Sequence, residues 1–306
     1  MIYDTIIIGN GPAGLSAAIF AARSNLKTMI IGEKLGGQAA DAHLIENYPG
    51  FPSISGMELM SKFEDHAKSQ GVEIIYGRAE RFEKKEDIFK IISGKEHYEG
   101  KTLILALGTT TRKLNIPGET EYLGRGVSYC ATCDGAFFKD KTVAIIGGGD
   151  AALSATLYLA GIAKKIYLIH RRQGFRGEPI KLKRVKESEN VELILDTVPT
   201  GILGENIVTG LKVKNVINNT EKEIKLQGVF IEVGSTPTTV MAKELGVNLD
   251  KAGYITVNSK QDTNIPGIFA AGDITTSSNY FRQIITAASE GSIAADSAFK
   301  FIKEEK

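Results

Sequence analysis

The sequence predicts an α/β protein made of two strand–turn–helix–strand units, the second inserted into the first. Three observations predict this. An apolar, β-branched run near the N-terminus leads into a glycine-rich turn and an alanine-rich helix. The same succession returns near the middle of the 306-residue chain. The C-terminal stretch is too short for a third unit, so it is expected to complete the first.

The first unit begins with a predicted strand over residues 5–8, which are rich in isoleucine. The turn follows at residues 9–14, Gly-Asn-Gly-Pro-Ala-Gly. An alanine-rich stretch then predicts a helix over 15–22, and a second strand is predicted over 27–31. This order is typical of a βαβ unit.

The second unit repeats the pattern. A strand is predicted over 142–146, a turn over 147–152, a helix over 153–160 and a further strand over 165–169. An internal repeat of this size predicts two nucleotide-binding domains.

Two segments, near residues 115–118 and 234–237, carry Pro and Gly and are interpreted as bridges between the domains. The chain after the second bridge ends in an alanine-rich helix. We therefore predict one discontinuous domain, residues 1–114 and 245–306, and an inserted domain, residues 115–244.

Both turns satisfy the pattern G-x-G-x-x-G/A. The first is filled by Gly9, Gly11 and Gly14, and the second by Gly147, Gly149 and Ala152. In this pattern the first glycine allows a tight turn, the second lets the backbone approach a pyrophosphate, and the third allows close helix–strand packing. One such turn also occurs for purely structural reasons. Two turns, each between a strand and a helix, predict two Rossmann-like dinucleotide-binding domains.

The residues after each second strand distinguish the two ligands. Glu33 can bind a ribose 2′-hydroxyl and favours FAD in the first domain, whereas Arg171 suits the 2′-phosphate of NADPH in the second. His170, Arg172 and Arg176 strengthen the second assignment, because several guanidinium groups can hold one phosphate. The alternative for this cluster is a solvated basic surface.

The two cysteines are spaced Cys130-Ala-Thr-Cys133. Zinc would need further ligands, and the four histidines are scattered along the chain. A redox dithiol is therefore favoured over a metal site or two buried apolar side chains. At a helix N-terminus such a pair has a lowered thiol pKa. Asp134 is a candidate proton donor, with a helix N-cap as its alternative role.

Composition excludes some classes of partner. Lys and Arg number 37 and Asp and Glu 36, which does not favour nucleic acid or an anionic membrane. No apolar run reaches the roughly 18 residues of a membrane span, and the N-terminus lacks the features of a signal peptide. The expected compartment is the cytoplasm.

These residues together resemble a known family, the low-molecular-weight thioredoxin reductases, over essentially the whole chain. The segments that carry the resemblance are residues 9–14, 36–38, 46–50, 130–135, 147–150, 170–172, 175–176, 272–273 and 282–283. The resemblance implies one FAD per chain, NADPH as reductant, a homodimer, and a thioredoxin or similar small protein as partner. It also makes Cys133 the thiol nearer the flavin and Cys130 the thiol that attacks the partner's disulfide.

The motifs and the resemblance together name the expected binding residues. For FAD they are Gly9, Gly11, Pro12, Ala13, Gly14, Glu33, Gly36, Gly37, Gln38, Asn47, Thr109, Gly272, Asp273, Arg282 and Gln283. For NADPH they are Gly147, Gly149, Asp150, Ala151, His170, Arg171, Arg172 and Arg176. The chain departs from the family at Ser154 and Ala155, where acids are frequent, at Gln173, and at Ser289, where glycine is usual.

The predicted activity is electron transfer from NADPH through FAD to the Cys130–Cys133 disulfide, and from there to a protein disulfide. Three alternatives share parts of this machinery: a dithiol oxidase that uses oxygen, a ferredoxin-dependent thioredoxin reductase, and a flavin redox sensor without turnover. The oxidase would not need Arg171, Arg172 and Arg176, which counts against it.

Overall fold

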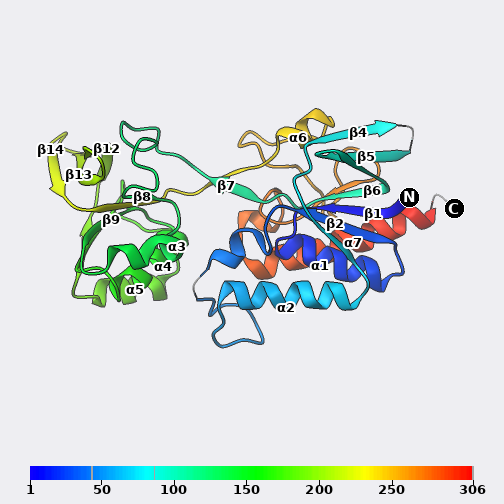
Figure 1. The fold of residues 1–306 in the computed structure, drawn as a ribbon, viewed down its shortest axis with the longest axis horizontal. Coiled ribbons are helices and arrows are strands. Elements are labelled where there is room, and N and C mark those ends of the chain that lie inside the picture. Colours follow the sequence, from blue (N-terminus) through cyan, green and yellow to red (C-terminus); the bar gives the residue numbers. More distant parts are fainter. Residues whose placement is uncertain (43, 86, 305–306) are drawn as a thin grey trace. The chain divides into compact units, whose positions relative to one another are not determined.

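The computed structural model describes residues 1–42, 44–85 and 87–304. The chain divides into two compact units, Met1–Thr110 with Thr236–Lys306, and Thr111–Ser235. The chain crosses between them at β7 (Thr109–Thr111) and β16 (Ser235–Pro237), which pair as a two-stranded ribbon (Figure 1).

The first unit contains a seven-stranded sheet with the order β3-β2-β1-β6-β5-β4, and β17 pairs with β6. Its strands are β1 (Ile2–Ile8), β2 (Thr28–Gly32), β3 (Glu73–Tyr76), β4 (Arg81–Lys85), β5 (Ile88–Ser93), β6 (Glu96–Leu105) and β17 (Ile268–Ala270). Its α-helices are α1 (Pro12–Arg23), α2 (Gly56–Ser69), α6 (Val240–Glu244) and α7 (Ile284–Glu304). The strands β1, β2, β3 and β17 run parallel to their neighbours, so the predicted βαβ opening is confirmed.

The central strand β1 is buried on both faces. Ile7 packs with α1, α2 and α7 on one face, whereas Ile6 and Ile8 pack on the other face with β5 and α6. The helices α1, α2 and α7 lie together on one side of the strands (Figure 1). A strand covered on both faces needs a continuous apolar run, which explains the three successive isoleucines at Ile6, Ile7 and Ile8.

The C-terminal segment completes the first unit. β17 pairs in parallel with β6, and α7 packs along α1 through small residues such as Ala17 and Ala294. Gly291 of α7 lies so close to α1 that a Cβ atom there would meet the Ala13 carbonyl oxygen at 2.0 Å. The expectation that the second domain is inserted into the first is therefore confirmed.

The second unit has a parallel sheet with the order β11-β10-β9-β15-β8 and an antiparallel sheet with the order β12-β13-β14. The strands of the parallel sheet are β8 (Val127–Ser128), β9 (Thr142–Gly147), β10 (Lys165–Ile169), β11 (Val191–Ile194) and β15 (Gly228–Glu232). The antiparallel strands are β12 (Thr197–Gly204), β13 (Val208–Asn215) and β14 (Glu221–Lys225), and the helices are α3 (Ala131–Asp134), α4 (Asp150–Ala160) and α5 (Pro179–Glu187).

The two faces of β9 are covered differently. Val143 and Ile145 pack with α3, α4 and α5, while Ala144 and Ile146 pack with β12, β13 and β14. Alternation of side chains along the strand thus divides the unit into two cores.

The chain passes between the units at residues 110/111 and 235/236. The limits predicted from the sequence, 114/115 and 244/245, lie a few residues further along the chain. On the C-terminal side the reason is α6, whose Ala242 is fully buried in the core of the first unit. Residues 240–244 therefore pack with the first unit and not with the second. No helix among the described residues is long and apolar enough to cross a membrane.

Candidate functional site

The first glycine turn connects β1 to α1. Gly9 has φ +108°, and a Cβ atom there would lie 2.2 Å from the Ala106 carbonyl oxygen. A Cβ atom on Gly14 would lie 1.7 Å from the Gly9 carbonyl oxygen. Gly11 differs, because its φ is −77° and its nearest such neighbour is the Gly36 carbonyl oxygen at 3.8 Å. Gly9 and Gly14 are thus required by the fold, whereas Gly11 leaves a free surface at the N-terminus of α1.

The second turn, between β9 and α4, shows the same division. Gly147 has φ +154°, and its Cβ would meet the Glu232 carbonyl oxygen at 2.2 Å. Gly149 has φ −100°, and no heavy atom of the described residues lies within 4 Å of where its Cβ would be. Each turn therefore leaves open space beside its second glycine, Gly11 or Gly149, at the N-terminus of the following helix. We call these two spaces the first and the second cradle. Such a cradle at a helix N-terminus suits a pyrophosphate.

Several predicted FAD residues lie around the first turn. Gly36 donates its backbone N–H to the Asn10 carbonyl oxygen at 3.0 Å. A Cβ atom on Gly37 would lie 3.7 Å from the Gly11 Cα, and one on Gly272 would lie 2.8 Å from the Ala13 Cβ. The fold thus brings residues 36–37 and 272 to the turn from distant parts of the sequence.

Glu33 directly follows β2, at the same edge of the sheet. Its carboxylate pairs with the Arg78 guanidinium at 3.5 Å, and both side chains are mostly exposed. Exposed pairs of this kind contribute little stability. The pair therefore leaves Glu33 able to exchange Arg78 for a ribose hydroxyl.

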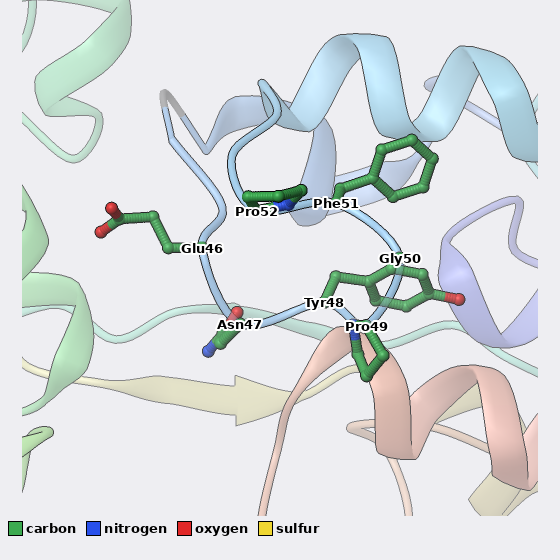
Figure 2. Close-up of a pocket in the computed structure, with 7 residues that line it drawn as sticks. All are labelled: Glu46, Asn47, Tyr48, Pro49, Gly50, Phe51 and Pro52. Carbon is green, nitrogen blue, oxygen red and sulfur yellow. The ribbon is translucent and has the colours of Figure 1, made fainter.

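Two hydrogen bonds join the remaining predicted polar FAD residues in pairs. The Gln38 amide donates to the Thr109 carbonyl oxygen, and Asn47 Nδ2 donates to Gln283 Oε1 at 3.0 Å. Asn47 belongs to a loop, residues 46–52, that lines a pocket of about 520 Å³ (Figure 2). The loop and the start of α7 are therefore tied together through side chains.

Arg282 is the most unusual predicted FAD residue. Its guanidinium lies over the Tyr254 ring, 4.0 Å from the centroid, and 5.2 Å from the Tyr280 centroid. Its Nε and Nη2 atoms are buried without a hydrogen-bond partner in the described part of the chain. Buried donors without acceptors are costly. Acceptor atoms of a bound group would satisfy them, so this residue fits the expected cofactor.

The charge of Arg282 influences the carboxyl group of Asp273. Burial raises the pKa of its carboxyl to about 6, with Arg282 lowering it and Glu290 raising it. Glu290 of α7 is only 5 % exposed and accepts hydrogen bonds from the Gly272 N–H at 2.8 Å, the Thr275 hydroxyl at 3.0 Å and the Ser278 hydroxyl. Glu290 therefore fixes the loop that carries Asp273.

The arginines of the second unit follow β10. Arg171, Arg172 and Arg176 are exposed, and none makes an ion pair with any residue that the structure describes. The backbone N–H of Arg176 donates to the Gly148 carbonyl oxygen at 2.8 Å, which anchors the arginine loop to the second glycine turn. Three free guanidinium groups beside such a turn can hold a phosphate.

The His170 side chain is buried and packs against Phe175 and the second glycine turn. It is 8 % exposed, its ring lies 5.0 Å from the Phe175 ring, and it would meet a Cβ atom on Gly148 at 2.3 Å. Burial lowers the pKa of its imidazole, and the neighbouring arginines lower it further. A neutral, buried His170 supports the glycine turn and the arginine loop, and its direct contact with NADPH stays a prediction.

Asp150 and Ala151 form the first turn of α4. The Asp150 carboxylate accepts the Glu178 backbone N–H at 2.8 Å and lies 3.6 Å from Lys181 Nζ. It thereby holds the start of α5 against the turn. Ala151 is exposed at the edge of the cradle.

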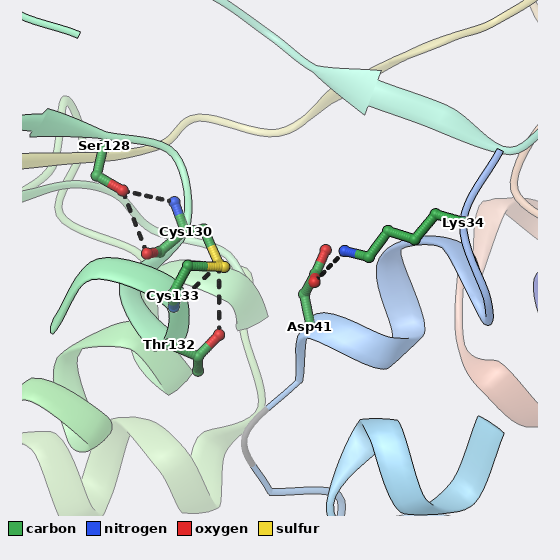
Figure 3. The surroundings of a disulfide bond; sticks show 6 residues. All are labelled: Lys34, Asp41, Ser128, Cys130, Thr132 and Cys133. Atoms are coloured by element: carbon green, nitrogen blue, oxygen red, sulfur yellow. Dashed lines mark hydrogen bonds and ion pairs between the residues drawn. A yellow bond between two sulfur atoms is a disulfide. The ribbon is translucent and has the colours of Figure 1, made fainter. Parts of the chain in front are cut away.

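Cys130 and Cys133 form a disulfide with their Cα atoms 5.3 Å apart. Cys130 caps α3: its Sγ accepts the Cys133 backbone N–H at 3.2 Å and lies 3.4 Å from the Thr132 hydroxyl (Figure 3). Ser128 binds both backbone groups of Cys130, with its Oγ 3.0 Å from the N–H. A backbone donor aimed at a sulfur favours its thiolate, which agrees with the expectation that Cys130 is the attacking thiol, and this role stays a prediction.

Asp134 ends α3. Asp134 occupies the N-cap position of the following turn of 3₁₀ helix (Gly135–Phe138), but its side chain makes no capping hydrogen bond there. Its carboxyl makes no hydrogen bond with another described residue. Its role as a proton donor beside the disulfide stays a prediction.

Glu119 connects the first bridge to the disulfide. It is 2 % exposed, and it accepts hydrogen bonds from the Leu114 N–H at 2.8 Å, the Asn115 N–H at 2.5 Å and the Tyr129 hydroxyl at 2.7 Å. Burial raises the pKa of its carboxyl, but these hydrogen bonds lower it by more, so the pKa lies below its usual value.

We expect Glu119→Ala to reduce stability by about 3 kcal/mol, because it leaves buried donors without an acceptor. Thermal unfolding with Glu121→Ala, an exposed neighbour, as control measures this. Since the folded pKa is lowered, the stabilisation is present above the ordinary glutamate pKa and is lost as pH falls through the folded value. The difference between wild type and variant should therefore shrink in acid, and a difference that grows in acid would contradict it.

Three further residues of the site are not among those predicted from the sequence. Asn10, between two turn glycines, is buried with an Nδ2 atom that has no partner in the described residues. Glu290 is one of two acids, with Asp296, in an alanine-rich stretch, a signal that could have found it. Glu119 follows the Pro-Gly of the first bridge, and its partners depend on the fold.

Comparison with known proteins agrees with this geometry. The family model for pyridine nucleotide-disulphide oxidoreductases matches residues 3–291. The chain belongs to this family. It is 41 % identical to the thioredoxin reductase of Bacillus subtilis, covering 99 % of this chain and 96 % of that protein.

Solved structures give the same result. The thioredoxin reductase of Lactococcus lactis has a TM-score of 0.96 and 42 % identity, with 99 % of each chain covered. That of T. acidophilum has a TM-score of 0.93 and 39 % identity, with 98 % of each chain covered. Two dinucleotide-binding domains are thereby confirmed, and FAD and NADPH are the cofactors of this family. The two cradles and the buried donors of Arg282 fit such groups.

Proposed function

We propose that the chain is an NADPH-dependent reductase of the disulfide in thioredoxin or a similar small protein. The observation that carries the proposal is the Cys130–Cys133 disulfide in a unit that also holds a nucleotide cradle with three free arginines. The full-length similarity to thioredoxin reductases supports the choice of substrate.

The expected division of labour follows from the two sites. In this proposal the discontinuous unit binds FAD through the first glycine turn, Glu33 and Arg282, and the inserted unit binds NADPH through the second turn and the arginines. Bound FAD supplies the passage of two electrons from the nicotinamide to the disulfide.

The chain's own residues carry out the exchange. Two electrons and two protons convert the Cys130–Cys133 disulfide to a dithiol. The Cys130 thiolate, stabilised by the Cys133 N–H, attacks one sulfur of the partner's disulfide and releases one partner thiolate, which a proton from Asp134 neutralises. Cys133 then attacks the Cys130 sulfur, which releases the second partner thiol and restores the disulfide.

The test is turnover with NADPH and with NADH on a panel of small dithiol proteins. We expect turnover with NADPH and at least one thioredoxin. Replacing both Arg171 and Arg172 by Ala should raise the KM for NADPH at least about tenfold and leave that for NADH unchanged, because only NADPH has the 2′-phosphate.

Lys183→Ala with Lys186→Ala, two changes in α5, serves as a charge-matched control. Electrons from reduced ferredoxin and none from NADPH would favour the ferredoxin-dependent alternative. Oxygen consumption with formation of disulfides would favour the oxidase, and flavin reduction without turnover would favour the sensor. A homodimer in the cytosol is part of the proposal and is supported by the resemblance alone.

A further inference from the structure

Glu232 occupies a special place in the second unit. It is the last residue of β15, and in the pairing of β15 with β9 it lies opposite Gly147, the first glycine of the second turn. Its carbonyl oxygen is the atom that a Cβ on Gly147 would meet. Glu232 therefore lies at the carboxyl edge of the sheet, one strand away from the cradle.

The order of the strands gives the direction of a dinucleotide along this edge. The sheet runs β10-β9-β15, with Arg171 and Arg172 after β10 and the cradle after β9. A dinucleotide with its 2′-phosphate on these arginines and its pyrophosphate in the cradle must extend its other half over β15. Neighbouring strands are about 4.8 Å apart, so the group over β15 is the ribose next to the pyrophosphate.

The side chain of Glu232 is free for such a contact. Among the residues described, none gives its carboxylate a hydrogen bond or an ion pair. Burial alone raises the pKa of this carboxyl to about 7. Asp150, the other acid beside the cradle, is already bound by the Glu178 N–H. Glu232 is half-buried, an acceptor partly removed from water without donors is costly, and the two hydroxyls of a ribose would supply donors.

We propose that Glu232 binds the ribose of the nicotinamide half of NADPH through its carboxylate. The inference rests on the proposed function, because it takes the second cradle as the NADPH site. Glu232 would thereby orient the nicotinamide half, while the arginines bind the adenosine half. Ser154 and Ala155 offer no carboxylate on the neighbouring helix for this task.

Three ligands test the proposal by calorimetry: NADP⁺, 2′-phospho-ADP-ribose, and 2′,5′-ADP. The first two contain the second ribose, whereas 2′,5′-ADP lacks it. We expect Glu232→Ala to weaken NADP⁺ and 2′-phospho-ADP-ribose at least about tenfold, as for loss of a charged hydrogen bond, and to leave 2′,5′-ADP unchanged. Glu232→Gln, which keeps a neutral acceptor, should have a smaller effect on the same two ligands.

The controls separate this inference from a structural effect. Glu221→Ala, an exposed acid on β14, should bind all three ligands as wild type does. Thermal unfolding should show that Glu232→Ala is at least as stable as wild type, since it removes a half-buried carboxyl that has no partner among the described residues. Weaker binding of all three ligands, of NADP⁺ alone, or of none would overturn the proposal. Failure of wild type to bind either NADP⁺ or 2′,5′-ADP would instead overturn the proposed function.

Discussion

Replacing either cysteine by serine should reduce NADPH-dependent disulfide reduction at least about a thousandfold, because the exchange needs two sulfurs in one chain. A hydroxyl in place of one thiol cannot close the Cys130–Cys133 disulfide that the structure shows. The measurement is oxidation of NADPH coupled to a thioredoxin. Reduction of the bound flavin by NADPH under anaerobic conditions should persist, since it precedes the sulfur step.

The two serine variants should differ in whether they accumulate a mixed disulfide with the partner protein. Cys133→Ser keeps Cys130, whose sulfur accepts the backbone N–H of residue 133, a donor that any residue at that position provides. It should form a lasting mixed disulfide with an oxidised partner, detectable by mass, because the resolving thiol is gone. Lys139→Ala, an exposed change beyond the turn, serves as a control that keeps both thiols and their hydrogen bonds. Residual turnover within tenfold of wild type in either serine variant would refute the role of the pair.

Placing a methyl group in either cradle should remove a ligand without unfolding the chain. Gly149→Ala has no described heavy atom within 4 Å of the new Cβ, and its φ of −100° suits any residue. We expect its melting temperature to match that of wild type and its affinity for NADPH to fall at least about tenfold, because the methyl group lies in the path of the pyrophosphate. Calorimetry with NADP⁺ measures this.

The equivalent change in the first unit is Gly11→Ala, with 3.8 Å to the nearest atom. It should fold normally and be purified with markedly less flavin, measured by the absorbance of the bound isoalloxazine. Gly201→Ala, in β12 with its nearest neighbour at 4.0 Å, is the matched control and should retain both ligands. Normal binding in both cradle variants would show that the cradles do not hold pyrophosphates.

Gly14→Ala provides the contrast. Its Cβ would lie 1.7 Å from the Gly9 carbonyl oxygen, so the close packing of α1 against β1 cannot survive. Gly14→Ala should therefore not fold, whereas Gly11→Ala and Gly149→Ala should fold and lose affinity for their ligands. The same sequence motif thus contains one glycine that the packing of helix against strand requires and another that leaves room for a ligand.

Much of the site was predictable because its signals are local. A glycine turn between a strand and an alanine-rich helix, an arginine pair after a strand, and a Cys-x-x-Cys pair each depend on a few consecutive residues. The predicted strand over 165–169 coincides with β10, and the helix over 153–160 lies within α4. The predicted helix starts after the true one because the first turn of α4 begins inside the glycine motif.

Residues whose partners are remote in sequence could not be assigned in this way. Glu119 and Glu232 look like ordinary acids in the sequence. Only the folded structure shows that the buried Glu119 has three donors and that the half-buried Glu232 has none among the described residues. Asp134 is equally compatible with a cap or a proton donor in the sequence, and the structure places it at the N-cap of the 3₁₀ turn without a side-chain capping hydrogen bond. His170 reads as a phosphate ligand, yet its ring packs under a glycine turn.

By itself the sequence determined the α/β class, the two nucleotide turns and the redox pair, because each is set by short-range spacing and residue type. It also predicted the insertion of one domain into the other, because the C-terminal stretch is too short for a third unit. Only the tertiary structure decided which glycines serve the fold and which leave room for a ligand. It also placed α6 in the first unit and showed that the Arg282 donors lack partners. These properties depend on distances between segments far apart in the chain, which packing sets and local sequence does not.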